Sequence, residues 1–196
     1  MSSKSDNKGR TRNWTFILYP DSAPENWQYI ISSFHIAWAS SPLHDSDLNG
    51  DGSEKKPHWH VLLAYDGVKT YEQVLAITQM CNGTIPNKVH STKALIRYFA
   101  HLDNPDKHQY TTSDIQCFNG FDISIYLKPT SSERYIIIRE ILQFIDDNYI
   151  IEYQDLINYA MKEHFDDWFP VLCDNSSYIC CQYIKSQRHR VVDRRS

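Results

Sequence analysis

His58 and His60 stand on either side of Trp59, in a segment whose apolar residues predict a β-strand from His58 to Tyr65. Side chains on a strand alternate between its faces, so the two histidines share a face with Cα atoms roughly 6.6 Å apart. Two imidazoles at that spacing can bind one metal ion. The same tripeptide also fits two half-exposed rings on a polar sheet face, and the tripeptide alone leaves both interpretations open.

A second pair of metal-binding residue types, His44 and Asp47, lies in a loop that leads back into the same strand. This pair favours the metal interpretation, with His44, Asp47, His58 and His60 as the ligands. Mixed imidazole and carboxylate ligands suit Mn²⁺ or Mg²⁺ with open water positions better than a closed structural zinc site. The ligand types do not choose between the two ions.

The same loop resembles a calcium-binding loop over residues 45–50, which match the beginning of the pattern D-x-[DN]-x-[DN]-G. The twelfth position of that pattern requires a chelating Glu, but it is Lys56 here. The residues that follow read as a strand instead of a helix. We therefore interpret the loop as turn chemistry and not as an EF-hand.

Tyr98 is the candidate nucleophile, on a predicted helix over residues 91–102. It lies where the apolar side of that helix meets a stripe of Lys93, Arg97 and His101. An aromatic residue at such a position is usually core packing. Beside a metal site the three cations would supply the electrostatic help that a phenol of pKa about 10 needs to attack, or would bind phosphate.

The 196 residues carry a formal net charge of −4, distributed unevenly. Residues 1–12 have four basic and one acidic residue and residues 185–196 have five and one, whereas residues 133–174 have ten acidic and three basic. Basic ends are typical of contact with polyanions and also of ordinary solubilising tails. We expect residues 1–12 to form a flexible basic tail.

The five cysteines are odd in number and show no paired metal-binding spacing, which argues against a disulfide framework and a zinc ribbon. No apolar run approaches the roughly 20 residues that span a bilayer, and no signal-peptide core follows Met1. We expect a cytoplasmic protein with no membrane partner.

The predicted elements form an α+β domain over residues 13–128, followed by a small all-α domain over residues 129–196. The order β-α-β-β-α-β is that of a ferredoxin-like antiparallel sheet with helices on one face, which leaves the other face open for a site. The expected segments are strands at 14–19, 36–40, 58–65 and 85–90, and helices starting near Pro24 and Tyr71.

In the second domain, Thr130 and Glu133 form a capping-box pattern ahead of an apolar helix that runs through Ile145. Further helices are expected over Glu152–Met161 and Tyr178–Lys185. About 65 residues of helical pattern are marginal as an isolated domain, which favours packing against partners.

These motifs together resemble the HUH endonucleases, and more narrowly the RepB-type initiators of rolling-circle plasmid replication. The resemblance rests on WTFILYP at residues 14–20, SPLHDSD at 41–47, PHWHVL at 57–62 and YFAH at 98–101. It extends through FDI at 121–123 and the helical tail over nearly the whole chain.

The resemblance implies that His44, Asp47, His58 and His60 bind the metal ion and that Tyr98 attacks DNA. The products would be a 5′-phosphotyrosyl link and a free 3′-hydroxyl that primes a host polymerase, and the reverse transfer would rejoin strands. It also implies binding to origin DNA, both as the single-stranded nick site and as duplex, contact with host replication proteins, and a ring-shaped homo-oligomer formed through the C-terminal helices.

Two other functions fit parts of the sequence. A metal phosphodiesterase would attack with activated water and leave Tyr98 a structural role. A non-catalytic oligomeric DNA-binding repressor would use the ion only to hold a loop, although the acidic segment 133–174 does not favour DNA binding there.

Overall fold

The computed structural model describes residues 9–193 of the chain. The chain divides into two compact units, residues 1–128 and residues 129–196, and each is described by itself below.

The first unit is built on a five-stranded sheet in the order β4-β1-β3-β2-β5, in which all neighbouring strands are antiparallel. The first four strands have the order of a split βαβ fold, and the α+β class expected from the sequence is confirmed. The elements are β1 (Arg10–Leu18), α1 (Trp27–Ser32), β2 (Ala37–Ser40), β3 (Trp59–Thr70), α2 (Tyr71–Met80), β4 (Asn87–Lys88), α3 (Thr92–Phe99), a 3₁₀ turn (Thr112–Asp114), β5 (Gln116–Phe118) and α4 (Ser124–Leu127).

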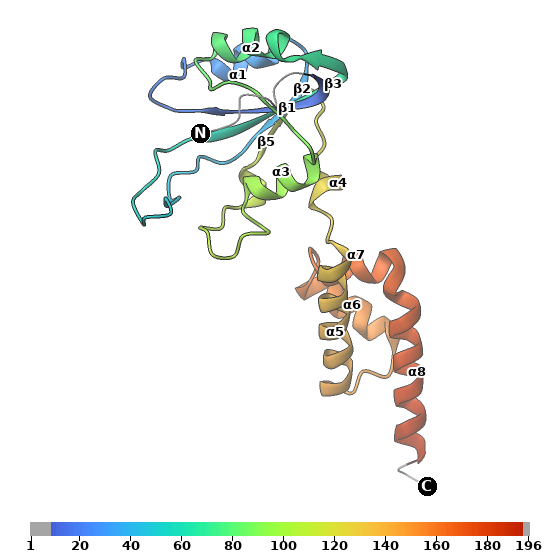
Figure 1. The fold of residues 1–196 in the computed structure, drawn as a ribbon. Helices are drawn as coiled ribbons and strands as arrows, with labels where there is room; N and C mark the ends of the chain where they lie inside the picture. The colour runs from blue at the N-terminus through green and yellow to red at the C-terminus, as the bar shows by residue number, and fades with distance from the viewer. Residues whose placement is uncertain (1–8, 194–196) are drawn as a thin grey trace. The chain divides into compact units, whose positions relative to one another are not determined.

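Helices cover both faces of this sheet. Successive side chains of β3 point to opposite faces, so neighbouring residues pack against different helices. Val61 and Leu63 are buried in the core under α1 and α2, whereas Leu62 is buried with Ile96 and Phe99 of α3. Figure 1 shows α1 and α2 on one side of the strands and α3 on the other. The face that we expected to be open is therefore partly covered by the helix that carries Tyr98.

Helix α3 is shorter than the sequence predicted, ending at Phe99 instead of near Leu102. His101 takes a left-handed backbone with φ of 57°, and the amides of His101 and Leu102 donate to the carbonyls of Tyr98 and Arg97. These two bonds form a Schellman motif, which usually places Gly at the left-handed position. A helical pattern does not reveal such an ending when the residue there is histidine.

The expected basic tail is partly in the sheet. Strand β1 begins at Arg10, which pairs with Thr70, because β3 continues beyond Tyr65 and offers a partner to these residues. Residues 1–8 lie outside the described part of the chain.

The second unit is helical, with its core formed by residues such as Ile141, Ile145 and Leu156. The capping box of Thr130 and Glu133 is confirmed, and so are the three predicted helices, each longer than expected. The helices are α5 (Ser131–Asp147), α6 (Tyr153–Glu163), α7 (Trp168–Val171), a π-helical turn (Leu172–Ser176) and α8 (Ser177–Asp193). Among the described helices of the chain, none is long and apolar enough to cross a membrane.

Candidate active site

The loop that carries His44 is fastened to the start of β3 by backbone hydrogen bonds. The amide of His44 donates to the carbonyl of His58 at 2.9 Å, and the amide of His58 donates back at 3.2 Å. The amide of His60 donates to Ser41 Oγ at 2.9 Å. The ring of His44 consequently lies with its centroid 5.4 Å from that of His58 and 5.0 Å from that of His60.

The four predicted ligands fall into two overlapping groups that share His44. Ligand atoms of His44, His58 and His60 lie within 4.8 Å of one another, and so do those of His44, Asp47 and His101. His44 Nδ1 is 3.7 Å from the Asp47 carboxylate. That is too long for a hydrogen bond but lies within the roughly 3–4.4 Å that separates two ligands of one ion.

Several polar atoms of this cluster are buried with no hydrogen-bond partner among the described residues. They are His44 Nδ1, Asp47 Oδ1, Asp47 Oδ2, His60 Nε2 and His101 Nε2. Burying such atoms without a partner costs free energy, and a cation among them would remove that cost. The residues therefore fit a divalent metal ion.

Hydrogen bonds at the far side of two rings support the same fit. His44 Nε2 donates to the carbonyl of Phe99 at 2.8 Å, and His58 Nδ1 donates to the carbonyl of Lys56 at 2.9 Å. Each bond fixes the tautomer and leaves the other nitrogen with a free lone pair, which is the usual arrangement of metal-binding histidines.

Burial keeps the rings of His44 and His60 neutral. It lowers the pKa of His44 to about 4, although the hydrogen bond to Phe99 opposes the shift. Burial, followed by the neighbouring histidines, lowers the pKa of His60 to about 3. Both imidazoles are unprotonated near pH 7, the form that binds metal.

Tyr98 reaches the same place from α3. Its half-buried ring lies edge-on to His60 with centroids 5.2 Å apart, and to His101 at 4.9 Å. A cavity of about 360 Å³ is lined by Tyr98, His58 and His60 together with Tyr19, Lys55 and Lys56, among others. The proposed nucleophile and two proposed metal ligands thus open onto one space.

Of the three cations expected beside Tyr98, only His101 contacts its ring, and all three have other partners. Lys93 Nζ donates to the carbonyl of Lys128 at 3.2 Å. Arg97 is buried, and its guanidinium donates hydrogen bonds to both carboxylate oxygens of Asp103. His101 is buried beside His44 and Asp47, and its Nδ1 donates to the carbonyl of His108 at 2.7 Å. None of the three lines the cavity in front of Tyr98, so a phosphate contact by these residues stays a prediction without structural support.

Lys107 is the cation that contacts Tyr98. Its Nζ donates to Tyr98 Oη at 2.8 Å and lies 4.5 Å from the centre of the tyrosine ring. Sequence analysis missed Lys107 because it belongs to the irregular loop after α3, where no periodicity relates it to Tyr98.

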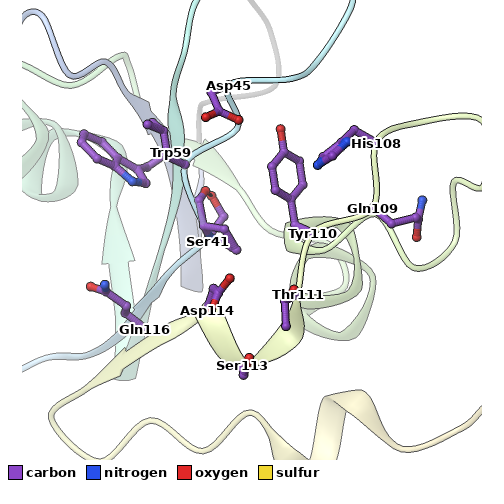
Figure 2. A pocket seen from close by; sticks show the side chains of 12 residues that line it. Ser41, Asp45, Trp59, His108, Gln109, Tyr110, Thr111, Ser113, Asp114 and Gln116 are labelled. Atoms are coloured by element: carbon purple, nitrogen blue, oxygen red, sulfur yellow. Dashed lines mark hydrogen bonds between the residues drawn. The ribbon is translucent and has the colours of Figure 1, made fainter.

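A second, larger cavity of about 720 Å³ is lined by Ser41, Trp59 and Tyr110, among others. Figure 2 shows Trp59 and Tyr110 on opposite sides of it with Ser41 between them. The ring of Tyr110 also stacks on His44 with centroids 4.4 Å apart, so this cavity lies next to a candidate metal ligand. Asp45 and Asp114 are among its lining residues, so it is unsuited to an anion.

Comparison with known proteins covers both units. The model of a family described as plasmid replication protein, origin binding domain, matches residues 6–124, and that of replication protein RepB, C-terminal, matches residues 131–189. A replication protein of Staphylococcus aureus is 46% identical over 189 residues, which cover 95% of each chain. Replication protein RepB of Lactiplantibacillus plantarum is 39% identical over 178 residues, covering 90% of this chain and 81% of the relative.

Proposed function

This chain belongs to the RepB-type family of plasmid replication initiators, and from that premise we propose that it nicks and rejoins origin DNA with Tyr98. The observation that carries the proposal is the shared cavity, onto which Tyr98 opens together with His58 and His60. A tyrosine beside a cluster of unpartnered metal-ligand atoms is arranged for attack on a phosphate held in front of it.

His44, Asp47, His58 and His60 would hold a divalent ion, Mn²⁺ or Mg²⁺, with His101 at the edge of the cluster. The bound ion would polarise the scissile phosphate. Tyr98 Oη then bonds to phosphorus, and the bond from phosphorus to the 3′ oxygen breaks with its electron pair passing to that oxygen. The phenolic proton leaves to water and the 3′ oxygen takes one from water. Because the phosphodiester is conserved as a phosphotyrosyl link, the same steps in reverse rejoin the strand.

The surroundings of the cavity suit a single DNA strand. Lys55 and Lys56 line it, and Lys56 Nζ lies 5.1 Å from the ring of Tyr19, so cations and an aromatic face occur together. Such a combination binds a phosphate backbone and stacked bases. The larger cavity between Trp59 and Tyr110 would take a base next to the scissile phosphate, because its carboxylates accept hydrogen bonds from base amino groups but repel phosphate.

We further propose that the helical unit assembles the protein into a ring-shaped homo-oligomer. It exposes large apolar side chains, and such side chains mark an interaction site where they form a contiguous patch. These include Tyr135, Tyr149, Phe165 and Tyr178. Duplex origin DNA and host replication proteins would be the other partners of such an assembly, in the cytoplasm where plasmids replicate.

The test is cleavage of a labelled single-stranded oligonucleotide spanning the origin, with Mn²⁺, by the parent protein and by Tyr98→Phe. We expect the parent to cut and the variant to lose cutting almost completely, because the substitution removes only the attacking oxygen. Equal cutting by both would favour the phosphodiesterase that uses activated water. Duplex binding that is unaffected by chelator, with no cutting under any metal, would favour the repressor.

A further inference from the structure

The loop after α3 folds back over Tyr98 and is held there by three contacts. Arg97 binds the carboxylate of Asp103. His101 Nδ1 donates to the carbonyl of His108 at 2.7 Å. The amide of Tyr110 donates to the carbonyl of Ala100 at 3.3 Å. These contacts bind residues 103, 108 and 110 to the end of α3, and Lys107 lies between residues 103 and 108 in the sequence.

This arrangement has a cost that packing alone does not explain. His101 holds a left-handed backbone, which is unfavourable for a residue with a Cβ. Gly would avoid that cost at the end of a helix. The ring of His101 instead binds the loop, and the loop places the Lys107 ammonium beside Tyr98 Oη.

We propose that Lys107 is a catalytic residue of the nicking reaction, acting on Tyr98 Oη in both directions of strand transfer. This inference rests on the proposed function. During attack the phenol oxygen loses its proton and carries negative charge until the bond to phosphorus is complete. In rejoining, the same oxygen leaves phosphorus with the electron pair of the broken bond. The Lys107 ammonium, 2.8 Å away, offsets that charge in each case.

Lys107 keeps its proton throughout and contributes no atom to the products. By microscopic reversibility, a group that stabilises only the transition state accelerates cleavage and rejoining by the same factor. The ratio of nicked to intact DNA at equilibrium is then unchanged. A lysine that merely bound DNA would change the concentration of protein needed for half-maximal rate, and a purely structural lysine would change the stability of the fold.

The experiment measures single-turnover cleavage and rejoining of an origin oligonucleotide by the full chain with Mn²⁺, comparing the parent with Lys107→Met. We expect both maximal rates to fall by roughly 10- to 100-fold, the value of one hydrogen bond to a charged group. Half-saturating protein concentration and the nicked fraction should change by less than about twofold. The matched control is Lys69→Met, because Lys69 Nζ also lies over a tyrosine ring, 5.6 Å from the centroid of Tyr65. Lys69 lies near the end of β3 that is far from His60.

Chemical rescue separates a catalytic lysine from a structural one. Added ethylammonium should restore part of the rate of Lys107→Ala, because it supplies the missing ammonium donor to a site that is otherwise folded. Three results would overturn the role of Lys107 and leave the Tyr98 chemistry intact. The maximal rates of Lys107→Met could equal those of the parent, or only its half-saturating protein concentration could change. Alternatively, ethylammonium could fail to restore any rate to Lys107→Ala. If the parent does not cut, the proposed function itself falls and the inference falls with it.

Discussion

The metal-free protein should lose stability steeply as the pH falls below about 6.5, because His44 and His60 are buried as neutral rings. Their pKa values are lowered to about 4 and about 3 in the folded chain, whereas both return to about 6.5 on unfolding. Between these values the unfolded state binds protons that the folded state does not. Stability is therefore fully present above pH 6.5 and is lost as the pH falls toward 4.

The size of the loss follows from the two shifts. At pH 5 each histidine favours the unfolded state by about 2 kcal/mol, so the pair contributes up to about 4 kcal/mol relative to pH 7.5. That is a large part of the roughly 5–15 kcal/mol by which a folded domain is stable.

The assay is urea unfolding in EDTA, followed by tryptophan fluorescence at a series of pH values. Four of the five tryptophans, Trp14, Trp27, Trp38 and Trp59, lie in the first unit and report on it. His60→Asn should lose only about half as much stability as the parent between pH 7.5 and pH 5. His90→Asn, which alters an exposed histidine of the same unit, should follow the parent. A parent curve that is flat over this range would refute the burial of neutral histidines at the site.

Three further outcomes are expected. Asp103→Asn should slow cleavage, as Lys107→Met does, because it loosens the loop that holds Lys107. The Mn²⁺ affinity measured by calorimetry should stay within about twofold of the parent value. A large loss of metal affinity would contradict that explanation. Ile145→Ala should destabilise the helical unit by about 2–5 kcal/mol in urea unfolding yet leave nicking of a single strand near the parent rate, and loss of nicking would show that the first unit depends on the second. Gly83→Ala should destabilise the first unit by about 1–3 kcal/mol, because the new Cβ would lie 2.6 Å from Phe16 Cδ2; unchanged unfolding would show that the ring of Phe16 moves aside freely.

The sequence was sufficient for the elements whose hydrophobic pattern is strong. The apolar pattern of residues 58–65 predicted β3 and the shared face of His58 and His60, and the capping box at Thr130 marked a helix start correctly. The order of elements gave the α+β class. These features are local, so a single segment contains all the information needed to predict them.

The remaining features depend on contacts between distant segments. The early end of α3 required a left-handed backbone at His101, which the helical pattern does not single out, and it brings His101 beside His44 and Asp47. Arg97 was predicted from its place in a basic stripe to supply positive potential or bind phosphate; its burial and its contact with Asp103, beyond the helix end, could not be predicted from that stripe. Lys107 could not be chosen among the loop residues until the loop was seen folded over Tyr98.

The central claim is that Tyr98 becomes covalently linked to DNA. The direct measurement is mass spectrometry of peptides from the full chain after reaction with Mn²⁺ and a single-stranded origin oligonucleotide. The account predicts one peptide that carries a nucleotide adduct through a 5′ phosphate on Tyr98, and none from Tyr98→Phe. Cleaved DNA without any protein adduct, or an adduct on another residue, would contradict it.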